Sequence, residues 1–364
     1  MPKQTRRGTR HAYDPDYAVP PGRTLQDTIE EMGVDQRELA KRSGISVKHV
    51  NQIIKGVATI TQETAIRLDR VTGVPARMWN QLEANYREQL ARIEEKKRLQ
   101  SDLGWLRGIP TRELIIRGAI EQQDDRVGLL EEALRFFGVA SVDAWKEGWQ
   151  RPQFAFRKSP SVQDKRGAIA TWLRLCERKA WEIPCRPFDK PRFRAALKQI
   201  RLLSTEPPDV FVNEMVKQSA EAGVVVVLEP ELPAASISGA AKWLTPTRAM
   251  IGLNLRGRSN DRFWFTFFHE AGHILNDSKK ETYIDIDYAD DPREQRANEF
   301  AANTLIPPAL AGDLQRLRSH ADVEQFAESI GIAPGIVVGR LQREKIVPYS
   351  HLNKLKVRLE WTPA

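Results

Sequence analysis

The segment 263–275 constrains the fold of this chain more than any other. It reads Phe-Trp-Phe-Thr-Phe-Phe-His-Glu-Ala-Gly-His-Ile-Leu, and polar residues at 259–261 and 276–277 predict where a helix through it begins and ends. A helix that is apolar on all sides is buried, and polar groups inside it are costly unless they are coordinated or paired. Any fold must therefore bury this helix and satisfy three polar side chains within it: His269, Glu270 and His273.

The spacing of these three residues indicates a metal site. Residues four apart lie on one face of a helix, so His269 and His273 can present two imidazoles to one metal ion. Glu270 lies beside that face, where a carboxylate can act as a general base without being a ligand. The pattern His-Glu-x-x-His therefore predicts catalytic Zn²⁺. The alternative is a buried helix that carries two hydrogen-bonded core histidines.

A catalytic zinc ion has three protein ligands and one open position, so a third ligand must come from elsewhere in the chain. Asp291-Pro292 predicts a helix start, which places Glu294 and Asn298 one turn apart on one face. We predict Glu294 as the third ligand, and Asn298 as the residue that holds a ligand histidine by its second ring nitrogen. The spacing Asp291-x-x-Glu294 also fits a capping box, in which Glu294 would only support the helix start. The stretch after the motif is rich in carboxylates: Glu281, Asp285, Asp287, Asp290, Asp291, Glu294 and Glu299.

A second pattern lies near the start of the chain, between residues 24 and 72. Short amphipathic helices are predicted there, including one over 36–42 capped by Asp35 and one over 47–55 capped by Ser46. The short turn between these two helices, centred on Gly44, is what a helix-turn-helix requires. The alternative is a small helical bundle used for protein contacts.

In a helix-turn-helix, the second helix enters the major groove with its N-terminal residues directed at the base edges. Val47 could then contact a thymine methyl group, and Lys48 and Gln52 could hydrogen-bond to bases. Gln36, at the start of the preceding helix, is placed for a phosphate. The candidate DNA-contacting residues are Gln36, Ser46, Val47, Lys48 and Gln52.

Composition is compatible with a nucleic-acid partner. The chain has 364 residues and a net charge of +8, which permits DNA binding without demanding it. Part of this charge belongs to a basic N-terminal segment that we expect to be flexible: Lys3, Arg6, Arg7 and Arg10. Two cysteines make no disulfide framework, which favours the cytoplasm. We find no membrane-spanning segment and no signal peptide in the sequence.

Two stretches around the metal motif resemble the ImmA/IrrE family of metallopeptidases. They read Trp-Phe-Thr-Phe-Phe-His-Glu-Ala-Gly-His-Ile-Leu at 264–275 and Glu-Gln-Arg-Ala-Asn-Glu-Phe-Ala-Ala-Asn-Thr-Leu-Ile-Pro at 294–307. The resemblance covers roughly residues 222–312. It implies zinc on His269, His273 and Glu294, with Glu270 as the catalytic base. It also implies an activity on helix-turn-helix repressors.

The N-terminal pattern has a resemblance of its own. Residues 36–56 read Gln-Arg-Glu-Leu-Ala-Lys-Arg-Ser-Gly-Ile-Ser-Val-Lys-His-Val-Asn-Gln-Ile-Ile-Lys-Gly, which is similar to the Xre/Cro-like DNA-binding family. Their continuation over 58–68 and 73–86 resembles HigA-type antitoxins. This second resemblance covers about residues 22–95 and implies an antitoxin-like repressor that binds an operator as a homodimer.

The rest of the chain is predicted as mainly helical with a small sheet. Apolar runs at 224–228, 237–244 and 250–255 predict short strands, and 101–222 reads as mostly helical. The segment 323–341 has a weak helix-turn-helix appearance, because Pro334 and Gly335 fall inside its second helix, and we expect it to complete the peptidase-like fold. The expected organisation is a basic N-terminus (1–22), a five-helix DNA-binding domain (23–95), a helical middle region (96–222), an α+β zincin-like metallopeptidase domain (223–312) and a helical extension (313–364).

These observations predict a DNA-binding regulator fused to a zinc-dependent endopeptidase that cleaves or senses a protein partner, such as a cognate toxin or a repressor. The alternative is an antitoxin-like repressor whose zincin domain is structural or sensory. The group that stabilises the oxyanion is not identified by the sequence, and three side chains are candidates: Tyr283, Tyr288 and His320.

Overall fold

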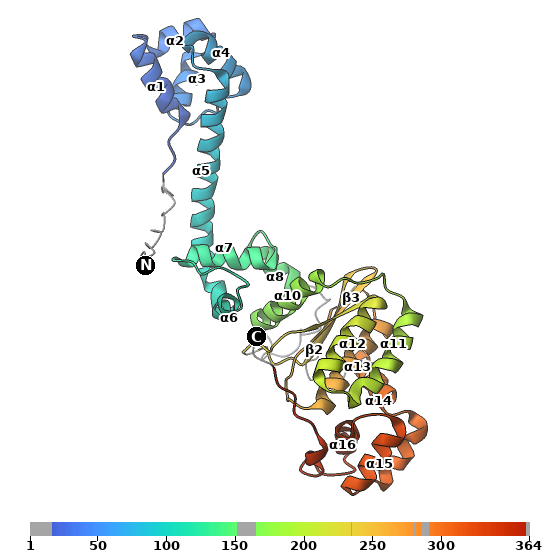
Figure 1. Cartoon of the computed structure of the whole chain (residues 1–364). Helices are drawn as coiled ribbons and strands as arrows, with labels where there is room; N and C mark the ends of the chain where they lie inside the picture. Colours follow the sequence, from blue (N-terminus) through green and yellow to red (C-terminus); the bar gives the residue numbers. More distant parts are fainter. Residues whose placement is uncertain (1–16, 151–164, 234, 280–281, 285–290, 362–364) are drawn as a thin grey trace, which may run out of the picture. The chain divides into compact units, whose positions relative to one another are not determined.

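The computed structural model describes residues 17–150, 165–233, 235–279, 282–284 and 291–361. The chain divides into two compact units, Met1–Leu103 and Gly104–Ala364 (Figure 1). The described residues are mainly helical and contain a four-stranded sheet, which confirms the predicted fold class. The basic N-terminal residues Lys3, Arg6, Arg7 and Arg10 lie outside the described part of the chain.

The described part of the first unit contains five helices: α1 (Pro21–Glu31), α2 (Gln36–Ser43), α3 (Val47–Ile54), α4 (Gln62–Thr72) and α5 (Ala76–Asp102). The predicted caps are present, because the side chain of Asp35 accepts a hydrogen bond from Glu38 N and that of Ser46 accepts one from His49 N. Gly44, at the turn between α2 and α3, has φ of 69°, a conformation that favours glycine. The helices enclose a small apolar core that includes Leu25, Leu39, Val50, Ile53, Leu68 and Trp79.

The second unit contains the sheet. Among the described residues its strands are β1 (Val224–Leu228), β3 (Arg248–Leu253), β2 (Gly239–Thr245) and β4 (Thr282–Ile284), in this spatial order. β1 pairs with β3 in parallel, and the other two pairs are antiparallel. The helices are α6 (Thr111–Ile116), α7 (Arg126–Phe137), α8 (Val142–Gln150), α10 (Arg166–Glu182), α11 (Lys190–Leu202), α12 (Pro208–Glu221), α13 (Asn260–Asn276), α14 (Pro292–Leu305), α15 (His320–Ile330) and α16 (Pro334–Arg343). Short 3-10 helices lie at Leu103–Gly108, Leu203–Thr205, Pro308–Arg316 and Asn353–Leu355.

Both faces of the sheet are covered, which explains why β1 is a continuous valine run. Val224 and Val226 point into one core, together with residues of α11, α12 and α13. Val225 and Val227 point into a second core, together with α10. The first core also contains residues of α15 and α16, so helices from the predicted middle region, metallopeptidase domain and C-terminal extension share one interior.

The last helix pair, α15 and α16, completes this interior. Pro334 is the first residue of α16, a position that proline tolerates. Most of α16 is buried, and it packs against α13. A Cβ atom at Gly335 would lie 2.5 Å from the Asn260 side chain, so the two helices approach closely. Because most of α16 is buried against the core, it is poorly placed to enter a DNA groove, which supports the expected structural role of this segment.

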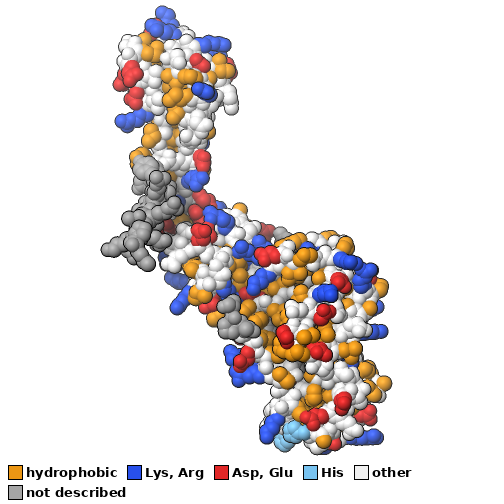
Figure 2. All heavy atoms as spheres, in the orientation of Figure 1, with side chains coloured by type: hydrophobic (Ala, Val, Ile, Leu, Met, Phe, Trp, Pro, Cys, Tyr) orange, Lys and Arg blue, Asp and Glu red, His pale blue; other side chains and the backbone are white. Residues whose placement is uncertain are grey.

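Charged side chains cover both units. On the face shown in Figure 2, lysine and arginine are interspersed with aspartate and glutamate, so the positive charge is not gathered into one patch there. Within the described residues, none of the helices has the length and hydropathy that a membrane crossing requires.

Candidate functional site

The helix α13 carries the predicted metal motif and is the most buried helix of the second unit. It begins after Ser259 and ends at Asn276, within the predicted limits. His269, Glu270 and His273 are 3%, 0% and 1% exposed. Gly272 lets α14 approach, because a Cβ atom there would lie 3.3 Å from the Ala297 backbone. The close packing of α13 and α14 positions the side chains of α14 beside the two histidines.

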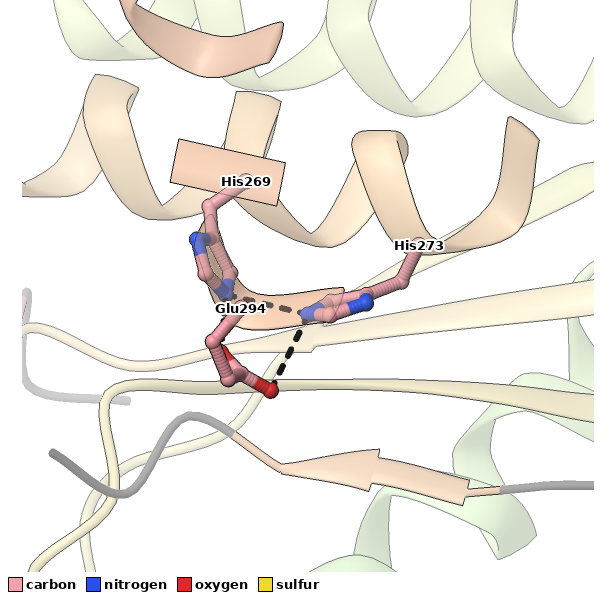
Figure 3. Close-up of side chains that lie close together, drawn as sticks. All are labelled: His269, His273 and Glu294. Atoms are coloured by element: carbon pink, nitrogen blue, oxygen red, sulfur yellow. Dashed lines mark hydrogen bonds and ion pairs between the residues drawn. The ribbon is translucent and has the colours of Figure 1, made fainter. Parts of the chain in front are cut away.

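The three predicted ligands lie close together (Figure 3). His269 Nε2 and His273 Nε2 are 3.1 Å apart. The Glu294 carboxylate lies 3.1 Å from His269 Nε2 and 3.5 Å from His273 Nε2. One ligand atom from each residue falls within 4.8 Å of the others. Two imidazole nitrogens and a carboxylate oxygen form a donor set that fits zinc.

The second ring nitrogen of each histidine, Nδ1, is also hydrogen-bonded. His269 Nδ1 donates to Asn298 Oδ1 at 3.1 Å, so Asn298 lies beside the ring as expected. His273 Nδ1 donates to Asp277 Oδ2 at 2.7 Å, and Arg296 donates to the other oxygen of Asp277 at 2.9 Å. Hydrogen bonds of this kind fix the tautomer and leave Nε2 free to bind a metal.

In the sequence, Asp277 indicates only the end of a helix. Its spacing of four residues from His273 repeats the spacing of the two histidines and could have indicated the contact. Arg296 carries no such local signal, because it reaches Asp277 only through the packing of α14 on α13.

The electrostatics of this cluster favour a cation. Burial lowers the pKa of His273, but hydrogen bonds to Asp277 and Glu294 outweigh burial and raise this pKa to about 10. Burial raises the pKa of Glu294, yet hydrogen bonds from His269 and His273 lower it to about 2. The metal-free cluster therefore holds a proton on His273. A metal ion requires a neutral imidazole, so its binding would release that proton.

Glu270 lies against the start of β2. A Cβ atom at Gly239 would be 2.9 Å from Glu270 Oε1 and 2.6 Å from Thr266 Cγ2, so only glycine leaves room for the carboxylate in its present position. No local sequence signal marks Gly239, because its importance depends on how β2 packs against α13.

Replacing Gly239 with alanine should displace the Glu270 side chain. We expect the free energy of unfolding to decrease by about 1–3 kcal/mol through overpacking; for the zinc peptidase that we propose, zinc should stay bound and activity should fall by about tenfold or more. Metal analysis, a peptide-cleavage assay and thermal unfolding measure the three quantities. The matched control is Gly312→Ala, because nothing lies within 4 Å of its Cβ position. Full activity in Gly239→Ala would contradict the inferred contact with Glu270.

The three oxyanion candidates are not equivalent. The Tyr283 ring stacks on His273, with centroids 4.5 Å apart and planes 4° apart. Its hydroxyl accepts from Ser278 N and donates to Ser278 O, so Tyr283 holds the imidazole plane and its hydroxyl is already engaged. His320 is exposed at the first residue of α15 and is not in the cluster. Tyr288 lies outside the described residues, as do Glu281, Asp285, Asp287 and Asp290.

The predicted DNA-contacting residues lie on α2 and α3. Lys48 is exposed, Val47 is 45% exposed and Gln52 is partly exposed. The exposed Ser46 caps α3 with its hydroxyl. The Gln36 side chain donates to Gln26 Oε1 and accepts from Asn51 Nδ2, both at 3.3 Å, and so links α2 to α1 and α3. The sequence placed Gln36 for a phosphate but did not reveal these amide contacts.

Comparisons with known proteins match both the N-terminal helices and the region of the candidate metal site. Residues 25–79 match the helix-turn-helix family, and residues 220–342 match the IrrE N-terminal-like domain, a peptidase family named M78. The chain is 33% identical over 63 residues to the uncharacterized HTH-type transcriptional regulator YddM of Escherichia coli strain K12, covering 17% of this chain and 67% of that protein. It is 30% identical over 80 residues to virulence-associated protein I of Dichelobacter nodosus, covering 22% of this chain and 74% of that protein.

Among solved structures, the chain is similar to the Pseudomonas aeruginosa antitoxin HigA with the higBA promoter. The identity is 27%, the TM-score is 0.22, and the match covers 23% of this chain and 94% of that one. The two family matches confirm the resemblances to the helix-turn-helix and ImmA/IrrE families, and the second match extends beyond the predicted limit at 312. The chain belongs to the helix-turn-helix family through residues 25–79 and carries an IrrE N-terminal-like domain of the M78 peptidases in residues 220–342.

Proposed function

We propose that this protein is a DNA-binding transcriptional regulator of the antitoxin type whose second unit is a zinc-dependent endopeptidase. The observation that supports the enzymatic part most directly is the convergence of His269, His273 and Glu294 within 4.8 Å. The buried Glu270 lies on the same helix, beside His269. A purely structural metal site has no need of a carboxylate there, whereas hydrolysis needs a base.

The chain's own residues account for the steps of peptide hydrolysis that they would perform. Zinc bound by His269, His273 and Glu294 would supply Lewis acidity to a water molecule and a peptide carbonyl. Glu270 would accept a proton from the attacking water and later deliver it to the leaving amine nitrogen. Asn298 and Asp277 would keep the two imidazoles oriented.

The sheet offers a place for the substrate backbone. β4 lies at the edge of the sheet and, among the described residues, pairs only with β2. It is next to the candidate metal site, because its Tyr283 stacks on His273. An extended peptide could add to this edge by backbone hydrogen bonds. The protein partner we propose is a cognate toxin or a repressor that presents such a segment.

The first unit would recognise an operator in double-stranded DNA. Helix-turn-helix proteins bind two half-sites as dimers, so we propose that this protein is a homodimer. We also propose that it acts in the cytoplasm. Lys48 and Gln52 would contact bases, while Gln36 would keep α3 in place through Gln26 and Asn51 as well as approach a phosphate.

Operator recognition can be tested with the promoter of the protein's own gene. Lys48→Ala and Gln52→Ala should each weaken specific binding by about 1–3 kcal/mol. Gln36→Ala should weaken binding to promoter and scrambled DNA alike, because a phosphate contact carries no sequence information. Fluorescence anisotropy at fixed salt measures these affinities, and Lys198→Ala on α11 of the second unit is the charge-matched control. Equal affinity of the wild-type protein for promoter and scrambled DNA would contradict the proposal.

A further inference from the structure

An exposed arginine lies close to the candidate metal site. Arg343 is the last residue of α16, and its guanidinium carbon is 4.8 Å from the centre of the Phe265 ring. Phe265 is one helical turn before His269, and the centres of these two rings are 6.3 Å apart. The two distances together place the guanidinium within about 11 Å of the His269 ring. Phe265 is partly exposed and lies on the same face of α13 as His269.

Carboxylates of α13 and of the residues that directly follow α13 and α16 are paired with other basic groups. Glu344 pairs with Arg340, Asp261 pairs with Lys356, and Asp277 pairs with Arg296. Within the described part of the chain, no carboxylate lies within ion-pair distance of Arg343 itself. The contact with Phe265 limits the movement of the side chain, while its N–H groups remain available for a ligand.

This position fits a contact with the substrate. An extended peptide advances by about 3.3–3.6 Å per residue, so 11 Å corresponds to about three residues from the scissile bond. With zinc bound, the charge of the ion would offset those of Glu270 and Glu294, so a preference for an acidic side chain would come from the guanidinium. A guanidinium can bind a carboxylate with two parallel hydrogen bonds, and the Phe265 ring offers an apolar surface for the methylene groups of that side chain.

We propose that Arg343 and Phe265 form a subsite that selects a glutamate or aspartate of the substrate within about three residues of the scissile bond. The inference rests on the proposed peptidase function and specifies its substrate class, an extended peptide with an acidic side chain at this distance. Arg343 would determine specificity without taking part in the chemistry. Because it is exposed, solvent screening limits the expected preference to about three- to tenfold over the uncharged amide.

The test uses binding rather than turnover, with peptide hydroxamates as zinc-directed probes. Two series are needed, with the hydroxamate at the carboxyl or at the amino end, so that both sides of the metal are covered. Each series carries glutamate, glutamine or lysine at one of the three positions nearest the hydroxamate. Dissociation constants for the zinc-loaded full-length protein come from isothermal titration calorimetry, after metal analysis has verified the zinc content.

We expect one glutamate probe to bind about three- to tenfold more tightly than its glutamine counterpart, and the lysine probe to bind most weakly. Arg343→Met should abolish this preference, because it keeps an unbranched apolar stem and removes the guanidinium. Arg343→Lys should retain part of the preference. The matched control is Arg194→Met, an exposed arginine on α11, which should leave the preference unchanged.

Two negative outcomes are distinguishable. If the zinc-loaded wild type binds hydroxamates with equal affinity for glutamate and glutamine at every position, or if Arg343→Met retains the preference, the acidic subsite is wrong and the peptidase proposal stands. If the protein binds zinc but no hydroxamate probe binds, peptides cannot reach the metal. The peptidase proposal then fails, and the subsite fails with it.

Discussion

Replacing Glu294 with alanine should remove zinc from the protein, whereas Glu299→Ala should leave it bound. The Glu294 carboxylate lies 3.1 Å from one ligand nitrogen and 3.5 Å from the other. Glu299 is exposed and five residues further on, so it points about 140° away around the helix. Loss of a group that merely orients a ligand costs about 10–100-fold in metal affinity, so loss of Glu294 itself should cost more than about a hundredfold. The wild type should hold about one zinc ion per chain.

Competition with a chelator, followed by elemental analysis, measures this affinity. His269→Ala and His273→Ala should lose zinc in the same way. Thermal unfolding of the metal-free proteins is the necessary control, because Glu294 could instead serve as a capping residue of α14. A capping role predicts that Glu294→Ala is less stable by about 1 kcal/mol and still binds zinc. The geometry favours the ligand role, since Asp291 caps α14 through Arg293 N and the Glu294 carboxylate is directed at the imidazoles.

Glu270→Gln should leave zinc bound and remove most peptidase activity. Glutamine has the shape of glutamate but cannot accept a proton, and the loss of a general base reduces a rate by about 10²–10⁴-fold. The assay incubates the zinc-loaded protein with a proteome-derived peptide mixture and detects new peptide ends by mass spectrometry. Binding to promoter DNA should be unchanged, because Glu270 lies in the second unit.

The variant also separates the two proposed roles of the metal. If the wild type binds zinc but cleaves neither the peptide mixture nor a cognate toxin or repressor, the alternative of a structural or sensory zinc site is supported. If Glu270→Gln cleaves as fast as the wild type, then Glu270 is not the base. In that case the activity comes from another group or from a contaminating protease, which His273→Ala would reveal by retaining the same activity.

Several features of this protein were determined by the sequence alone. The strand at 224–228 formed as predicted, because four of its five residues are valines, whose branched side chains favour a strand over a helix. The caps at Asp35, Ser46 and Asp291 formed as well, since each depends on a hydrogen bond to a residue two or three positions away. Other strands shifted by two residues at one or both ends, because strand ends depend on the partner strand and not on the local pattern.

Only the tertiary structure decided which distant residues support the histidines. The pattern at 269–273 puts two imidazoles on one face, but it does not say which groups will face them. The contact of Arg296 with Asp277 requires α14 to pack on α13, and the stacking of Tyr283 on His273 requires β4 to lie beside that helix. The space at Gly239 and the position of Arg343 over Phe265 depend likewise on the sheet and on α16. Local spacing therefore predicted the pair of imidazoles, while long-range packing, which no sequence period encodes, determined the groups around them.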